Sequence, residues 1–189
     1  FKDSCPFFSS VSPEQKVENY AVLGGTPAYL LEFDYSKPLL ENIGEKILKK
    51  NKFLYQDTMF VIQQELNEPK TYYSIIKSIA KGNTKIGTIV NDTGIDKQAA
   101  MKYLSVLQQL HLIERRVPIT EKHPEKSRNG IYLLRDQYFK FWFRFVFENV
   151  EYIEQDKQVL LLKEKIAPEL NEFVGKAYEE IALQWIKTQ

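Results

Sequence analysis

The 189-residue sequence has little of the covalent and metal-binding chemistry that stabilises or activates many small proteins. Its single cysteine, Cys5, excludes an internal disulfide framework, and two histidines beside it leave almost no soft metal ligands. No apolar run of roughly 18 residues or more is present, which excludes a membrane-spanning helix. No signal peptide is recognisable either. We therefore expect a cytoplasmic protein with no metal site of the soft kind.

What the sequence does contain is enough apolar material for a folded core. Hydrophobic residues make up 43% and aromatic residues 13% of the chain, a composition that excludes intrinsic disorder. The formal net charge of +1 hides an uneven distribution, because residues 1–70 carry −2, residues 71–135 carry +6 and residues 136–189 carry −3. A basic middle section between two acidic ones makes nucleic-acid binding the first hypothesis to consider.

The N-terminal 68 residues are predicted to form a series of short helices. Ser12-Pro13-Glu14 places an N-cap, a proline and an acid in the order that begins a helix, and Gly24-Gly25 is expected to end it. Thr26-Pro27 repeats this signal, Ser36 is expected to cap a third helix, and a fourth amphipathic segment covers about residues 53–66.

Three further helices are predicted in residues 69–135. Thr71 is expected to cap the first, Thr84 or Lys85 to open the second, and Asp96 to cap the third and longest. Short polar turns separate the three helices.

The turn before the third of these helices contains Gly94, which can supply a positive φ angle. Two short strands, 112–117 and 131–134, follow the helix and are joined by the polar linker 118–130. Helix, helix, glycine turn, helix and then a hairpin with a basic tip is the order of a winged helix-turn-helix.

Four blocks of sequence, in the same order, resemble a known family. Residues 92–122 and 138–146 resemble the winged helix and the following segment of predicted prokaryotic, archaeal-type ATPases of the AAA+/STAND superclass. Residues 24–30, Gly-Gly-Thr-Pro-Ala-Tyr-Leu, resemble the end of the helical lid of that ATPase domain. Residues 170–180 resemble the first helix of its C-terminal domain, which is related to PD-(D/E)xK nucleases.

The resemblance implies a mainly α fold with a small β-hairpin, cut from a larger protein. Residues 1–68 would be a lid-like helical segment of the ATPase domain, and residues 69–135 the winged helix-turn-helix. Residues 136–189 would be an aromatic linker helix and the start of the nuclease-like domain. The partners it implies are the missing ATPase and nuclease-like domains of the same protein, with a nucleotide-controlled movement of the lid against the winged helix.

The residues for either kind of catalysis are missing from this chain. A phosphate-binding loop needs G-x-x-x-x-G-K-[S/T], but the single Gly-Lys pair, Gly175-Lys176, is followed by Ala177. Glu179 or Glu180 could be a helical carboxylate of a nuclease-type site, or both could form a solvated acidic pair. We expect no enzyme activity, no cofactor, no metal site and no catalytic residue here, so that ATP and Mg²⁺ belong to the parent protein.

His111 departs from the family pattern. Winged helices of this type usually have glycine just past the third helix, where the chain turns through a left-handed conformation. Histidine tolerates that conformation better than most residues, so we expect the turn to form with a small penalty.

The candidate DNA-binding residues lie on the third helix and in the hairpin linker. The helix would enter the major groove and the linker would contact the phosphate backbone of double-stranded DNA. The alternative is a packing or protein–protein scaffold module without DNA affinity, in which the basic surface complements acidic flanks. The candidate residues are Lys97, Gln98, Lys102 and Ser105 on the helix, and Lys122, Lys126 and Arg128 in the linker.

Seven aromatic residues occur within ten positions after the second strand. One helix face cannot bury them all, so the segment is expected to pack between two elements. A stacking platform for single-stranded nucleic acid is the alternative. The seven are Tyr138, Phe139, Phe141, Trp142, Phe143, Phe145 and Phe147.

Overall fold

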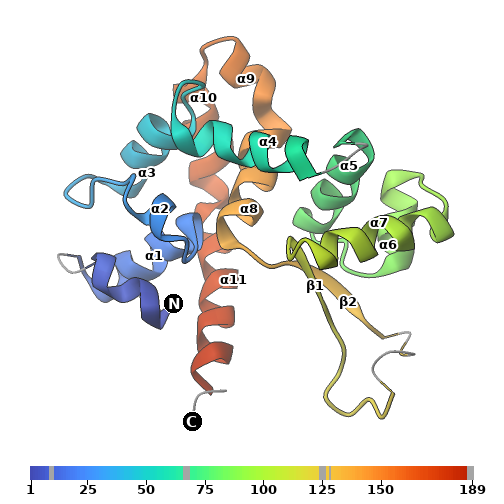
Figure 1. The fold of residues 1–189 in the computed structure, drawn as a ribbon. Helices are drawn as coiled ribbons and strands as arrows, with labels where there is room; N and C mark the ends of the chain where they lie inside the picture. Colours follow the sequence, from blue (N-terminus) through green and yellow to red (C-terminus); the bar gives the residue numbers. More distant parts are fainter. Residues whose placement is uncertain (9–10, 66–68, 124–126, 128, 187–189) are drawn as a thin grey trace. The chain divides into compact units, whose positions relative to one another are not determined.

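A computed structural model of the chain is mostly helical, with one two-stranded antiparallel hairpin (Figure 1), which confirms the predicted fold class. No helix in the described part of the chain has the length and apolar character needed to cross a membrane. The structure describes residues 1–8, 11–65, 69–123, 127 and 129–186.

The chain forms two compact units. Unit 1 combines Phe1–Phe60 with Phe145–Gln189, and unit 2 is Val61–Arg144. The predicted winged-helix residues 69–135 therefore all belong to unit 2, whereas the two ends of the sequence contribute to the same unit.

Unit 1 is built from short helices and one long one. A 3-10 helix, Lys2–Phe8, is followed by α1 and α2, and π-helical turns continue α3 and α10 at Ile43–Ile47 and Leu162–Ile166. The α-helices that contribute to this unit are α1 (Pro13–Leu23), α2 (Pro27–Leu30), α3 (Leu39–Asn42), α4 (Phe53–Glu65), α9 (Val150–Glu154), α10 (Gln158–Leu161) and α11 (Ala167–Ile186).

The first and last α-helices of the chain, α1 and α11, pack against each other in unit 1 (Figure 1). α1 begins as predicted, because the Gln15 amide donates to Ser12 Oγ (3.3 Å) while the Ser12 amide donates to Gln15 Oε1 (3.0 Å). It ends at Gly24, whose φ of 68° lies in the region that favours glycine.

Two predicted helix starts are wrong. Ser36 does not cap α3, which begins at Leu39 after Pro38, because the Ser36 hydroxyl and amide both donate to Asp34 Oδ1 (2.6 and 3.0 Å). Thr71 does not cap α5, because that helix already begins at Pro69. Proline is well suited to the first helical position, where no backbone donor is needed.

Unit 2 packs three helices against the hairpin. β1 pairs with β2 from Ile113 opposite Leu134 to Arg116 opposite Ile131. The segment before α6 adds to the outer side of β2, where the Tyr132 amide donates to the Thr84 carbonyl at 2.7 Å. The elements are α5 (Pro69–Ala80), α6 (Ile86–Thr93), α7 (Lys97–Gln109), β1 (Ile113–Arg116), β2 (Ile131–Leu134) and α8 (Gln137–Phe141).

The core of unit 2 is formed by apolar side chains on one side of α5, α6 and α7 and by the two strands. α5 contacts α6, α7 and β2, and α7 contacts β1. The buried side chains include Ile75, Ile76 and Ile79 of α5, Ile89 of α6, Ala100, Leu104 and Leu107 of α7, and Ile113 and Leu134 of the strands.

The ends of α6 and α7 confirm the predicted turn chemistry. Gly94 ends α6 in the left-handed conformation, with φ 68° and ψ 9°. Asp96 caps α7, since its Oδ2 accepts from the amides of Gln98 (2.8 Å) and Ala99 (3.1 Å). Past α7, His111 has φ 58°, the left-handed turn that was expected there.

The aromatic segment after β2 is core, as its first interpretation predicted. Six of its seven rings are at most 6% exposed, and Phe147 is half-buried. Tyr73 and Phe143 lie 6.1 Å apart in unit 2, and Phe145 meets Phe173 edge-to-face at 5.5 Å in unit 1. Rings buried in this way are not available as a stacking platform for bases.

The left-handed turn at His111 generates a stability prediction. His111→Gly should raise the free energy of unfolding by up to about 1 kcal/mol, and His111→Val should lower it by about 1–2 kcal/mol, because a β-branched residue is strained at positive φ. Denaturant unfolding followed by circular dichroism measures both.

Gln109, two residues earlier and the last residue of α7, is the matched control. There glycine should destabilise the protein by up to about 1 kcal/mol and valine by less. If Gly and Val rank in the same order at both positions, the left-handed turn at His111 is wrong.

Candidate nucleic-acid interface

The exposed face of α7 collects the four helical residues that were predicted to contact DNA. Lys97, Gln98, Lys102 and Ser105 are all exposed, while the opposite side of the helix is buried against α5 and β1. At about 100° per residue, these four side chains span an arc of about 140° around the helix. Lys97 and Lys102 form the two edges of this arc.

Met101 also lies on this face, and the sequence analysis missed it. Its side chain is 53% exposed, although methionine is usually a core residue. The signal was available in the spacing, because Met101 follows Lys97 by four residues and precedes Ser105 by four. We call Lys97, Gln98, Met101, Lys102 and Ser105 the α7 face.

A negative charge stands at the N-terminal end of this face. The Asp96 carboxylate caps α7 and is exposed. Its charge is favourable for the helix, because the first amides and the helix dipole attract an anion. The same charge is unfavourable for a phosphate approaching the start of α7.

The hairpin loop is held in shape by contacts of its own. Arg115 on β1 donates from Nη2 to the Ser127 carbonyl at 2.6 Å, and the Ser127 hydroxyl donates to Glu121 Oε2 at 2.7 Å. A Cβ at Gly130 would lie 2.5–2.6 Å from atoms of the Arg115 guanidinium, so a larger residue there would displace this side chain from its present position. Arg116 is in turn paired with Glu114.

Of the three predicted linker residues, the structure describes one. Lys122 is exposed. Lys126 and Arg128 lie outside the described residues. The structure therefore places five of the seven predicted DNA-contacting side chains, four on α7 and one on the loop.

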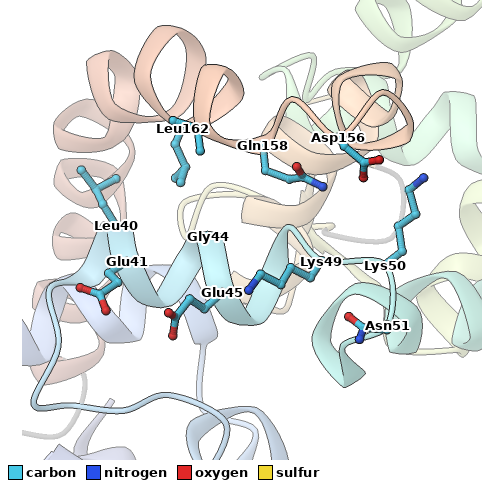
Figure 2. Close-up of a pocket in the computed structure, with 11 residues that line it drawn as sticks. Leu40, Glu41, Gly44, Glu45, Lys49, Lys50, Asn51, Asp156, Gln158 and Leu162 are labelled. Atoms are coloured by element: carbon cyan, nitrogen blue, oxygen red, sulfur yellow. The ribbon is translucent and has the colours of Figure 1, made fainter.

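Unit 1 contains a pocket of about 610 Å³, lined on one side by residues of α3 and of the segment that follows it, and on the other by residues between 156 and 162 (Figure 2). Leu40 and Leu162 point into this space from its two sides, and a Cβ at Gly44 would lie 2.8 Å from Leu162 Cδ1, so the two segments approach closely at the glycine. At the other end, Lys50 Nζ contacts Glu154 Oε2 at 2.9 Å.

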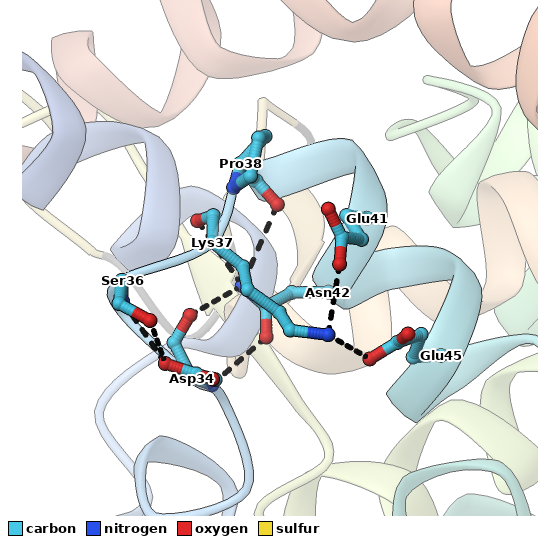
Figure 3. Close-up of polar contacts among 7 residues, drawn as sticks. All are labelled: Asp34, Ser36, Lys37, Pro38, Glu41, Asn42 and Glu45. Carbon is cyan, nitrogen blue, oxygen red and sulfur yellow. Dashed lines mark hydrogen bonds and ion pairs between the residues drawn. The ribbon is translucent and has the colours of Figure 1, made fainter.

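Two acidic residues that line this pocket, Glu41 and Glu45, are also paired. Figure 3 shows Lys37 Nζ between Glu41 and Glu45, 2.8 Å from a carboxylate oxygen of each. Beside it, Asn42 is buried, accepts from the Asp34 amide and donates to the Asp34 carbonyl, both at 2.8 Å. These contacts fix the loop before α3 and leave the pocket without a nucleophile–base pair among its lining residues.

No group of three or more His, Cys, Asp or Glu side chains that could hold a metal ion occurs among the described residues. On α11, Glu179 is exposed and Glu180 half-buried, and Lys176 pairs with Glu172 at 2.6 Å.

The chain is similar to proteins from archaea and bacteria. Residues 142–189 match a family described as archaeal and bacterial proteins of unknown function. The chain is 32% identical over 186 residues to the uncharacterized protein MJECL04 of Methanocaldococcus jannaschii, a match that covers 98% of this chain. It spans 41% of that relative's length. No solved structure matches the chain.

The Lys37 cluster predicts a pH dependence of stability. The hydrogen bond from Lys37 lowers the pKa of Glu45, and the hydrogen bonds to Glu41 and Glu45 raise that of Lys37. A carboxyl group with a lowered pKa contributes stability above its unfolded-state pKa and loses it as the pH falls through the folded value. Lys37→Met should therefore lower the denaturant midpoint at pH 7, and the two proteins should converge near pH 3.

Lys163→Met, an exposed lysine elsewhere in unit 1, serves as the control and should leave the midpoint unchanged. An equal loss at both pH values for Lys37→Met would mean that its effect is packing and not charge.

Proposed function

We propose that unit 2 is a winged helix-turn-helix that binds double-stranded DNA, with α7 in the major groove and the hairpin loop along the phosphate backbone. The observation that carries this proposal is the arrangement of the α7 face, which has a lysine at each edge and Gln98, Met101 and Ser105 between them. The net charge of +6 on residues 71–135 supports the same function.

The dimensions of DNA favour this docking. The major groove is wide enough to admit an α-helix, and a row of phosphates runs along each of its walls. Lysines on both edges of one helix face can reach both rows, and each neutralised phosphate releases counterions. The side chains between the lysines then face the base edges.

We propose further that the chain is the DNA-binding and regulatory section of a larger AAA+/STAND-type ATPase. The sequence contains no phosphate-binding loop, and the relative in M. jannaschii is more than twice as long as its matched part. In this proposal ATP and Mg²⁺ bind outside these 189 residues, and α11 begins a nuclease-like domain. Nucleotide binding would move the lid-like segment against unit 2 and change its access to DNA.

A second candidate is a protein-binding module, favoured by exposed apolar side chains on unit 2. Met101 is 53% exposed on α7, and Ile119 is fully exposed on the hairpin loop. Apolar side chains among polar ones are typical of the centre of a protein interface. This candidate predicts no duplex affinity, even at low salt.

Titration with duplex DNA at several salt concentrations tests the first proposal. A protein that makes about four phosphate contacts should lose affinity with a log–log slope near −3.6. Replacing Lys97 and Lys102 together by alanine should weaken binding and make the slope shallower by about 2.

The control replaces Lys163 and Lys165, two exposed lysines of unit 1, by alanine. This variant has the same total charge as the first, so it corrects for a general electrostatic effect. Equal losses in the two variants would mean that α7 does not contact the DNA, and no binding at low salt would rule out a DNA-binding function for the chain.

Removing the negative charge of Asp96 should have the opposite effect. Asparagine is as good an N-cap as aspartate, so Asp96→Asn keeps α7 intact while it removes repulsion from the phosphates. We expect the affinity at low salt to rise about two- to fivefold.

Asp156→Asn in unit 1 is the matched control, since Asp156 is exposed and its φ of 55° suits asparagine. Its DNA affinity should equal that of the unmodified protein. An unchanged affinity with Asp96→Asn would show that the start of α7 points away from DNA, and a weaker complex would contradict repulsion between Asp96 and the phosphates.

A further inference from the structure

The centre of the α7 face has a chemical character different from its edges. Around the helix axis, the side chains of Gln98, Met101 and Ser105 lie between those of Lys97 and Lys102. Together they offer one amide, one thioether and one hydroxyl. Resting on the proposed DNA-binding function, we propose that α7 is a reader of A·T base pairs. Gln98 would recognise adenine, and Met101 would contact the methyl group of thymine.

Gln98 has both the position and the chemistry to recognise adenine. It is the second residue of α7, and the N-terminal residues of a recognition helix are the ones that approach base edges. A glutamine amide can accept from the N6 amino group of adenine while it donates to N7. Only the backbone amide of Gln98 is engaged by Asp96, and its exposed side chain makes no hydrogen bond to the described part of the chain.

Met101 supplies an apolar contact one turn further along. In the major groove thymine is marked by its C5 methyl group, which pairs with apolar side chains. A flexible, polarizable thioether adapts to such a surface without needing a fixed geometry. The 53% exposure of Met101 leaves its side chain accessible for this contact.

The absence of arginine from α7 also favours recognition of A·T over G·C pairs. Bidentate recognition of guanine is the commonest specific contact and is made by arginine or lysine. α7 contains no arginine, and its two exposed lysines stand at the edges of the face, on the sides of the phosphates. Ser105 accepts or donates to several bases and adds little discrimination.

The test starts from an unbiased selection. The full chain selects binding sites from a random duplex library, and the enriched duplex is then titrated with two base analogues. 7-Deazaadenine removes the N7 acceptor, and uracil in place of thymine removes the C5 methyl group without changing the base pairing. We expect enrichment of A·T pairs at the centre of the site.

Each analogue is combined with the variant that lacks its partner. 7-Deazaadenine should weaken DNA binding by the unmodified protein by about 5- to 100-fold. It should have little further effect on the affinity of Gln98→Ala. Uracil in place of thymine should weaken DNA binding by the unmodified protein severalfold and leave the affinity of Met101→Ala unchanged. Gln109→Ala, an exposed glutamine at the far end of α7, is the control that should remain sensitive to both analogues.

The failures of the two proposals are distinguishable. If no duplex binds at low salt, the DNA-binding function itself is wrong. If duplexes bind with a steep salt dependence but without preference for A·T pairs, only the base-reading role of α7 is wrong. The base-reading role of α7 is also wrong if the preference for A·T pairs persists but each analogue weakens DNA binding by Gln98→Ala and Met101→Ala as much as it weakens binding by the unmodified protein. All these side chains are exposed, and thermal unfolding checks that each variant is folded.

Discussion

Burial of the apolar stripe of α7 is the interaction on which the rest of unit 2 depends. Ala100, Leu104 and Leu107 are at most 1% exposed and lie against α5 and β1. Each fully buried leucine contributes about 1.5–3 kcal/mol, so rotating the helix about its axis would be costly. Because the stripe fixes this rotation, it also fixes which side chains face solvent. The lysines, Gln98 and Met101 are therefore presented together, although no side-chain hydrogen bond or ion pair to the described part of the chain holds them.

Short backbone features decide how α7 is placed between its neighbours. Gly94 and His111 both turn the chain through positive φ, one before the helix and one after it. Asp96 caps the helix between these turns, and Arg115 occupies the space above Gly130 in the hairpin. The turns and the cap are local requirements of the backbone, whereas β2 also contacts α5 and the Thr84 carbonyl, which lie far from it in the sequence. His111 shows that this geometry tolerates a residue other than glycine at a modest cost.

Unit 1 depends on contacts between residues that are distant in sequence, because its two parts come from opposite ends of the chain. α1 packs against α11, and Lys50 pairs with Glu154 across about a hundred residues of sequence. Gly44 allows the two π-helical turns of this unit to approach, since any side chain there would meet Leu162. Glu41 and Glu45 of the resulting pocket pair with Lys37, and Lys50 pairs with Glu154, so these three charged residues help to hold the loops.

The sequence by itself determined the mainly helical class, the helix caps at Ser12 and Asp96, the left-handed turns at Gly94 and His111, and the polar face of α7. These features depend on residues within a few positions of each other, and their rules are local. The starts of α3 and α5 could not be predicted in the same way, because Ser36 bonds to Asp34 and Pro69 begins the helix ahead of Thr71. Only the tertiary structure decided that α1 meets α11, that Phe145 packs against Phe173, and that Met101 stays exposed. Those outcomes depend on which surfaces remain uncovered after distant segments pack, and hydrophobicity alone does not specify the partner.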